Sequence, residues 1–205
     1  MFTLIPTNQH AQDYLAEANE RNPGPWVAHS RQVAEAAQRI AAAYPALDPE
    51  GAYTLGLLHD IGRREGKSDM RHVLDGYNFL LAEGYPDAAR ICLTHSYPIP
   101  NIGAGSGKWD GTANEEGFVA SYLASIEYTD YDRLIQLCDA LCLPGGPVLM
   151  EKRLLDVSLR HGFNKFTIRK WKAFFDIRTE FETVIGTSIY QLLPGVVENT
   201  FGFTP

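Results

Sequence analysis

Apolar residues recur along most of the chain at spacings of three and four positions, as they do on one face of an α-helix. A clear case is the series Val33, Ala37, Ile40 and Tyr44. Valine, isoleucine and threonine do not alternate with polar residues over the runs that half-buried strands require. The pattern therefore predicts an all-α protein.

Prolines, glycines and helix-capping residues divide this pattern into separate helices. The sequence Asn22-Pro23-Gly24-Pro25 ends one helix and begins the next, because proline suits the first turn of a helix and not its interior. Asp48-Pro49-Glu50 is an N-terminal signal for a further helix, and Gly62 is a fitting stop. We expect helices over about residues 8–21, 25–44, 49–61, 70–82, 86–95, 115–124, 131–142, 147–160 and 168–185.

Residues 96–117 interrupt the helical pattern with several glycines and prolines. A loop of this length inside a compact domain is usually functional or mobile. Its run from Gly103 to Lys108 is similar to a phosphate-binding loop, but Trp109 stands where a Walker motif needs serine or threonine. We expect either a lid over a site or a plain surface loop.

The length of 205 residues, without repeats or a linker, predicts one domain spanning residues 1–205. The net charge of −7 argues against general affinity for nucleic acid, which needs lysine and arginine to neutralise phosphates. Pro6 interrupts the N-terminus too early for a signal peptide, and no apolar run approaches the ~20 residues that cross a bilayer. Three cysteines without CxxC spacing suit a reduced compartment. We expect a cytoplasmic protein with neither a nucleic-acid nor a membrane partner.

Residue types that bind metal ions lie beside apolar positions of several predicted helices. His29 shares a face with Val33 and Ile40, and Asp139 follows Ile135 by four positions. A buried carboxylate without a partner loses its hydration, so a cation is the simplest neutralising partner. The candidate ligands are His29, His59, Asp60, His72, His95 and Asp139.

The ligand types bound the choice of metal. Imidazole nitrogen and carboxylate oxygen together suit manganese, iron, zinc or cobalt, and six such groups favour an octahedral ion or a pair of ions over a tetrahedral structural zinc. We expect one or two divalent ions, with iron or manganese favoured and cobalt or magnesium not distinguished from them. His10 and His161 lack this setting, and His161, just before Gly162, is interpreted as a structural residue at a helix end.

The order His29, then His59-Asp60, then Asp139 resembles the signature of the HD-domain superfamily, a helical fold of metal-dependent phosphohydrolases. The sequence from His59 to Gly62 reproduces its common HDIG form. The resemblance spans about residues 26–143 and implies an HD-domain helical bundle with a metal site in its core. Helices over residues 147–190 would pack on that core.

The same resemblance implies an assignment of ligands. His29, His59, Asp60 and Asp139 would hold one metal ion. In the branches of the superfamily with two metals, two further histidines lie between the His-Asp pair and the last aspartate, and His72 and His95 match these positions. Asp60 would then bridge the two ions.

The resemblance also implies a function: a metal-activated water attacks a phosphate ester or anhydride of a small, nucleotide-like substrate. Arg63 follows the expected ligands at once, and a guanidinium there would stabilise the charge of the transition state. We therefore expect Asp60 and Arg63 to be catalytic. The expected substrate-binding residues are Arg63, Arg64, Lys67, Lys108 and Arg153.

Two alternatives stay open. The superfamily includes di-iron oxygenases with four histidines and two aspartates in this order, and ligand types alone do not separate them from hydrolases. A non-catalytic regulatory domain that binds metal or ligand ranks last, because such members usually lose ligands and this chain keeps the full set. The hydrolase is preferred as the commoner chemistry of the superfamily. The expected partner is a small phosphorylated substrate, and a homodimer is left open.

Overall fold

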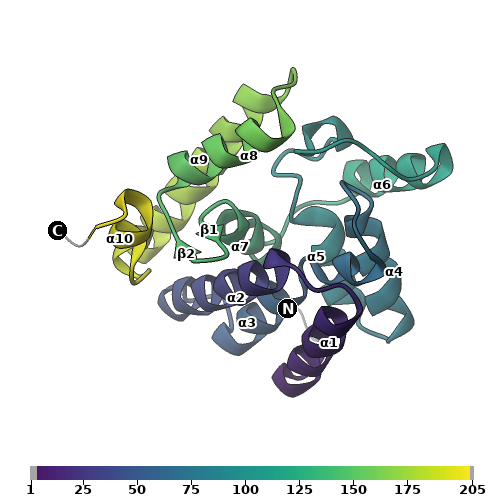
Figure 1. The fold of residues 1–205 in the computed structure, drawn as a ribbon. Coiled ribbons are helices and arrows are strands. Elements are labelled where there is room, and N and C mark those ends of the chain that lie inside the picture. The colour runs from purple at the N-terminus through teal and green to yellow at the C-terminus, as the bar shows by residue number, and fades with distance from the viewer. Residues whose placement is uncertain (1–3, 204–205) are drawn as a thin grey trace.

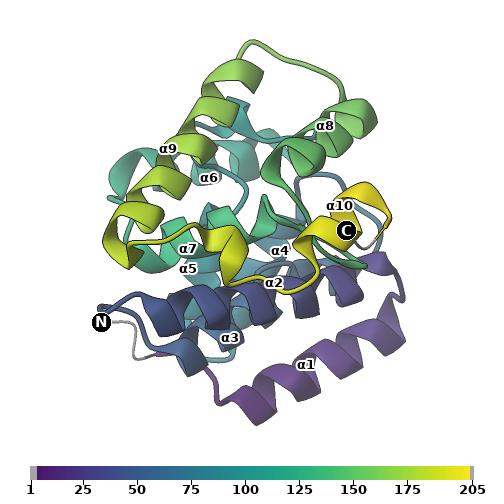
Figure 2. The same cartoon turned by 90° about the vertical axis from the view of Figure 1, so that its left-hand side faces the viewer.

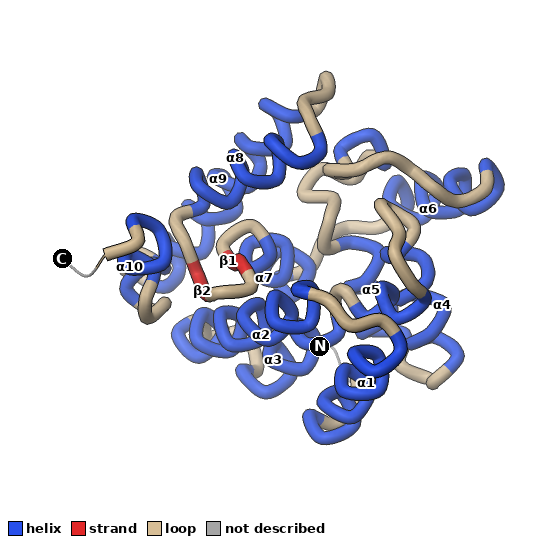
Figure 3. Tube along the Cα trace, viewed as in Figure 1, coloured by secondary structure: helices blue, strands red, loops and turns tan. Residues whose placement is uncertain are grey.

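The computed structural model describes residues 4–203, which form ten α-helices gathered around a buried core (Figure 1). Helix dominates, and the only strands in this range are two short ones that form a hairpin (Figure 3). None of the helices in these residues combines the length and the apolarity needed to span a bilayer. The α-helices are α1 (Asn8–Arg21), α2 (Pro25–Ala43), α3 (Pro49–Leu58), α4 (His72–Ala82), α5 (Pro86–Thr94), α6 (Ala113–Ser125), α7 (Asp130–Asp139), α8 (Met150–His161), α9 (Thr167–Ile185) and α10 (Val196–Phe201); the 3₁₀ helices are η1 (Ile61–Glu65), η2 (Ile102–Ala104) and η3 (Ile189–Gln191); the strands are β1 (Cys142–Leu143) and β2 (Gly146–Pro147).

Helix α2, which contains His29, and helix α3, which is followed directly by His59, lie unusually close together. Gly56 of α3 permits this approach, because a Cβ added there would lie 2.6 Å from the Cα atom of Ala34 in α2. The absence of a side chain at Gly56 thus lets the two helices approach until the His29 and His59 rings are 5.3 Å apart.

A second glycine brings η1 against α4. A Cβ on Gly62 would lie 2.0 Å from the carbonyl oxygen of His72 and 2.3 Å from the amide nitrogen of Gly76. Both neighbours are main-chain atoms, so only glycine fits at this position. The contact sets Asp60, which immediately precedes η1, beside His72, the first residue of α4.

The C-terminal helices share the larger core with the N-terminal ones. Phe174, Ile177 and Phe181 of α9 are buried in it, and the Phe181 ring lies 4.9 Å from that of Tyr44, at the end of α2. Figure 2 shows α7 in the middle of the molecule, with α2 and α3 below it and α8 and α9 above. Helices α8 and α9 therefore cover one side of the core that the earlier helices form.

Some expected boundaries are corrected by the structure. The helix expected over residues 131–142 ends at Asp139, since the chain turns into the hairpin of β1 and β2, with Leu143 opposite Gly146. Strands of two residues are too short to show any alternation in the sequence. The expected loop over 96–117 is shorter, because Thr112 and Glu115 form a capping box that begins α6. Neither η3 nor α10 was expected.

Candidate metal centre

Three histidines reach one point from the ends of three helices and share a hydrogen-bond pattern. In each case Nδ1 faces the carbonyl oxygen of the residue three positions earlier in the chain. A carbonyl oxygen only accepts hydrogen bonds, so each Nδ1 is the donor and each Nε2 keeps its lone pair. The three bonds join His59 to Gly56 at 2.7 Å, His72 to Asp69 at 2.6 Å and His95 to Cys92 at 3.0 Å.

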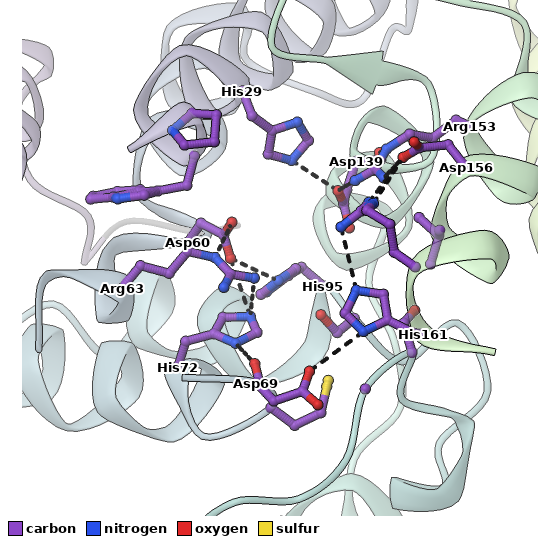
Figure 4. Close-up of a pocket in the computed structure, with 18 of the residues that line it drawn as sticks. His29, Asp60, Arg63, Asp69, His72, His95, Asp139, Arg153, Asp156 and His161 are labelled. Carbon is purple, nitrogen blue, oxygen red and sulfur yellow. Dashed lines mark hydrogen bonds and ion pairs between the residues drawn. The ribbon is translucent and has the colours of Figure 1, made fainter. Parts of the chain in front are cut away.

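The three Nε2 atoms converge on the carboxylate of Asp60, which Figure 4 shows beside His72 and His95. Asp60 Oδ1 lies 3.2 Å from His72 Nε2 and 3.6 Å from His95 Nε2. Asp60 Oδ2 lies 3.9 Å from His59 Nε2. His59 Nε2 and Asp60 Oδ1 are buried, and neither has a hydrogen-bond partner among the described residues.

These contacts set lone pairs against a carboxylate, which is unfavourable unless a cation lies between them. Protons do not fill that role, because burial lowers the pKa of His59 to about 3, and burial with the charge of Arg63 lowers the pKa of His72. Burial opposes ionisation of Asp60, but the charge of Arg63 holds its pKa well below the ordinary value. Imidazole nitrogens around a charged carboxylate, one oxygen of which has no hydrogen-bond partner among the described residues, fit a divalent metal ion.

A second group of ligand atoms lies around Asp139. Its Oδ1 is 3.0 Å from His29 Nε2 and 3.2 Å from Arg153 Nη2. Burial opposes ionisation here too, but the hydrogen bond from His29 and the charge of Arg153 lower the pKa of Asp139. Ligand atoms of His29, His59 and Asp139 all lie within 4.8 Å of one another, as do those of His59, Asp60 and His95.

His59 links the two groups. Its ring lies 5.3 Å from the ring of His29 and 4.9 Å from that of His95, edge-on to both. The His72 ring continues the series, 5.6 Å from His95. The structure thus gathers all six side chains proposed as ligands from the sequence into one continuous cluster.

Arg63 is the cationic side chain that contacts Asp60 and His72, as Arg153 contacts Asp139. Arg63 Nε donates to Asp60 Oδ2 at 2.7 Å, and its Nη2 lies 3.4 Å from His72 Nε2. Burial disfavours the charged form, but the charge of Asp60 outweighs it and raises the pKa of Arg63. The space between Asp60 and His72 therefore accepts a positive charge.

A cavity of about 440 Å³ opens over the cluster (Figure 4). This is the size of a small-molecule site. His59 lies beneath the surface of the cavity, and the other candidate ligands form its floor. Apolar side chains and charged ones share its walls, among them Trp26, Met70, Leu143 and Val157, and Arg63, Asp69, Arg153, Asp156, Arg160 and His161.

Of the residues expected to bind substrate, Arg63 and Arg153 line this cavity. Arg64 does not. Its guanidinium is buried elsewhere, paired with Glu17 and 3.8 Å above the ring of Phe79. Successive side chains of a 3₁₀ helix point about 120° apart, so η1 directs Arg63 and Arg64 to different sides. This position corrects the expectation that Arg64 binds substrate.

Lys67 and Lys108 are exposed and do not line the cavity. Lys108 acts through its main chain: its amide donates to Asp69 Oδ2 at 2.7 Å, and its carbonyl accepts from Met70 at 3.2 Å. These bonds hold the loop before α6 against the start of α4. The structure thus does not place the Lys67 and Lys108 side chains in the cavity, and their expected role in substrate binding stays a prediction.

The cavity also contains residues that sequence analysis missed. His161, interpreted there as structural, lies in the wall with its Nδ1 3.6 Å from Asp69 Oδ1. Arg160 lies beside it, with Nη1 3.3 Å from His161 Nε2. One signal for Arg160 was available, because Arg153, Val157 and Arg160 recur at helical spacing along one face of α8.

Histidines and carboxylates that project from separate helices beneath a cavity define a helical protein with a candidate metal centre. The HD domain family model matches residues 26–143, a segment that contains all six of these side chains. The match covers more than half of the chain, and the chain belongs to the HD domain family. This family includes many metal-dependent phosphohydrolases. No curated protein and no solved structure gave a significant match.

Proposed function

We propose that this protein is a metal-dependent phosphohydrolase that cleaves a phosphate ester or anhydride of a small, nucleotide-like substrate. The observation that carries the proposal is the convergence of the His59, His72 and His95 Nε2 atoms on the Asp60 carboxylate, beneath a cavity with arginines in its walls. Two of the converging atoms, His59 Nε2 and Asp60 Oδ1, are buried without a hydrogen-bond partner among the described residues. Such a cluster suits divalent ions, and such walls suit a phosphorylated ligand.

The candidate ligands divide as the family resemblance implies. His29, His59, Asp60 and Asp139 would hold one ion, and His72 and His95 a second, with Asp60 shared between the two. Divalent ions bound there would supply an activated water and positive charge beside the phosphoryl oxygens. The main-chain carbonyls that accept from Nδ1 of His59, His72 and His95 keep these rings in the orientation that binding requires.

Arg63 and Arg153 bind the phosphoryl group in this proposal. Each donates to a carboxylate of the cluster, Arg63 to Asp60 and Arg153 to Asp139, so their positions are set before substrate arrives. Planar guanidinium groups match the geometry of phosphate oxygens, and groups fixed in advance need no reorganisation as charge develops. The apolar wall from Trp26 and Leu143 excludes water from the remaining side of the substrate.

Hydrolysis of phosphorylated compounds, followed as released orthophosphate, pyrophosphate or nucleotide, tests the proposal. Metal-free protein would be loaded with Mn²⁺ or Fe²⁺ without oxygen and assayed on nucleotides, dinucleoside polyphosphates and sugar phosphates. We expect release from at least one class, lost on Asp60→Asn substitution together with bound metal. Silence across the panel by protein that holds metal would contradict the proposal, and oxygen uptake by the iron-loaded form would then favour the di-iron oxygenase.

Substitution of two adjacent arginines, Arg63 and Arg64, tests whether Arg63 binds substrate, with Arg64 as the matched control. Arg63→Ala should lower kcat/KM by about two orders of magnitude at unchanged metal content, since it removes a charge aimed at the phosphoryl group. Arg64→Ala removes a charge one position away that faces Glu17 and Phe79. It should lower the melting temperature and leave kcat/KM near the wild-type value. Equal kinetic effects of the two substitutions would remove Arg63 from the site.

A further inference from the structure

The segment 157–175, from the middle of α8 into α9, has a charge unlike that of the rest of the chain. It contains five of the 18 lysines and arginines and no aspartate or glutamate, although the net charge of the protein is −7. Four of the five are exposed, and the fifth, Lys170, is buried. The exposed four are Arg160, Lys165, Arg169 and Lys172.

The same part of the molecule exposes large apolar side chains. Leu159 is 75 % exposed, Ile168 69 % and Phe163 66 %. Leu155 and Leu159 are spaced by four, so they lie on one side of α8, and Phe163 follows two residues after the end of that helix. The Phe163 ring lies 6.2 Å from that of Trp171, which carries the apolar surface across the turn to α9. We call this surface the α8–α9 tip.

The tip projects from the molecule. In both Figure 1 and Figure 2 the turn between α8 and α9 lies at the upper extremity, away from α1, α2 and α3. It also borders the cavity, because Arg160 and His161 at the end of α8 belong to the cavity wall. A surface that bound the tip would therefore lie close to the entrance of the candidate site.

We propose that the α8–α9 tip binds the surface of an anionic lipid bilayer. Exposed leucine, isoleucine and phenylalanine flanked by lysine and arginine are the composition of helices that lie in a membrane interface. Basic side chains are attracted to anionic headgroups, and apolar ones enter the acyl boundary. The charge complementarity favours this occupant over a second copy of the chain, because self-association through the tip would place like charges side by side.

The aliphatic side chains distinguish a bilayer from nucleic acid. A nucleic-acid surface combines positive charge with aromatic rings on which bases stack. Here the two most exposed apolar residues of the tip are Leu159 and Ile168, which offer no ring. The proposal departs from the expectation, drawn from the absence of an apolar run long enough to cross a bilayer, that the chain has no membrane partner. A surface segment that lies in the membrane interface needs no such run.

Vesicle co-sedimentation of the full-length protein tests this inference. The vesicles would contain phosphatidylcholine alone, or phosphatidylcholine with about one third phosphatidylglycerol. We expect binding to the anionic vesicles that weakens as salt is added, and little binding to the neutral ones. Equal binding to both, or to neither, would overturn the proposal. The readout is binding, so it is independent of any phosphohydrolase activity.

Substitutions locate the contact. The pairs Leu159→Ser with Phe163→Ser, and Lys165→Glu with Arg169→Glu, should each lower the vesicle partition coefficient about tenfold or more. Arg31→Glu with Arg39→Glu is the matched control, since it changes the net charge equally at exposed positions of α2. Circular dichroism and thermal melting of each variant verify that it folds.

Three results would overturn the assignment. One is equal loss of binding in the control and the tip variants. Another is a dimer of the wild-type protein that Leu159→Ser with Phe163→Ser converts to monomer, which would make the tip an interface between copies. The third is binding of single-stranded RNA more tightly than of anionic vesicles.

Discussion

Replacing Gly62 with alanine tests how the fold positions the candidate metal centre. The new Cβ would lie 2.0 Å from the carbonyl oxygen of His72 and 2.3 Å from the amide nitrogen of Gly76, whereas ordinary contact begins at 3.4 Å. Because both neighbours are main-chain atoms, no side-chain rotation relieves the overlap. Gly62 has an ordinary negative φ, so the cost of alanine there is steric alone. Helix α4 and η1 would have to separate by about 1.4 Å, the shortfall in that contact.

The expected loss of stability follows from this overlap. Overpacking usually costs about 1–3 kcal/mol, and displacement of main chain puts Gly62→Ala at the upper end, about 3 kcal/mol. In a protein of this size each kcal/mol lowers the melting temperature by roughly 2–4 °C, so we expect a decrease of about 6–12 °C. The same separation draws His72 away from Asp60. We therefore also expect weaker metal binding, by about tenfold or more for the ion that His72 would hold.

Thermal denaturation of chelator-treated protein, followed by metal titration, measures both effects. Gly117→Ala is the matched control: Gly117 lies in α6, and a Cβ added there would have nothing within 4 Å. Alanine at this position should stabilise the protein by up to about 1 kcal/mol, because glycine weakens a helix interior. A Gly62→Ala protein that melts within about 2 °C of wild type would refute the close approach of η1 and α4.

Three further predictions concern buried charge. The free energy of unfolding of the metal-free protein should fall as pH drops below about 6.5, because His59 takes up a proton there in the unfolded chain but only near pH 3 in the folded one. The loss reaches about 2 kcal/mol at pH 5. A His59→Gln protein should show a shallower decline in melting temperature with pH. Asp132 is fully buried and accepts hydrogen bonds from Arg90 at 2.8 Å and from Thr94 at 2.7 Å. The substitution Asp132→Ala should therefore lower the free energy of unfolding in urea by about 3–5 kcal/mol. An unchanged urea midpoint would contradict the buried ion pair. Divalent metal at one hundred times its Kd should stabilise the wild type by about 2.7 kcal/mol and Asp139→Asn by much less, and equal shifts in melting temperature would exclude Asp139 as a ligand.

The sequence predicted most of the helices because their apolar spacing and capping residues agree. The expected start at Pro25 and the stop near residue 21 match α1 and α2, and Asp48 caps α3 as expected. The end of α7 was placed too late. Apolar residues continue beyond Asp139, and the reversal there depends on Gly146, whose φ of +137° is a conformation that side chains rarely adopt.

The residues of the cavity walls were less predictable from the sequence than the cluster of histidines and aspartates beneath the cavity. The histidines and aspartates stand out in the sequence because they are polar residues among apolar ones. His161 and Asp69 meet only because the end of α8 lies beside the loop that precedes α4, and no local pattern encodes that contact. Arg63 and Arg64 are chemically identical neighbours, and only the turn of η1 sends one to the cavity and the other to Glu17.

The hydrogen bonds that orient His59, His72 and His95 have a consequence for how this protein can change. Each ends on a main-chain carbonyl, so no substitution elsewhere in the sequence deletes the acceptor. A site oriented by aspartate or glutamate side chains can be retuned or lost by a single codon change in a second residue. Here the carbonyl groups that orient the histidines stay in place as long as the backbone at these helix ends keeps its conformation. The ligands cannot change without loss of the metal, so substitutions that alter the substrate without losing the metal are confined to the cavity walls.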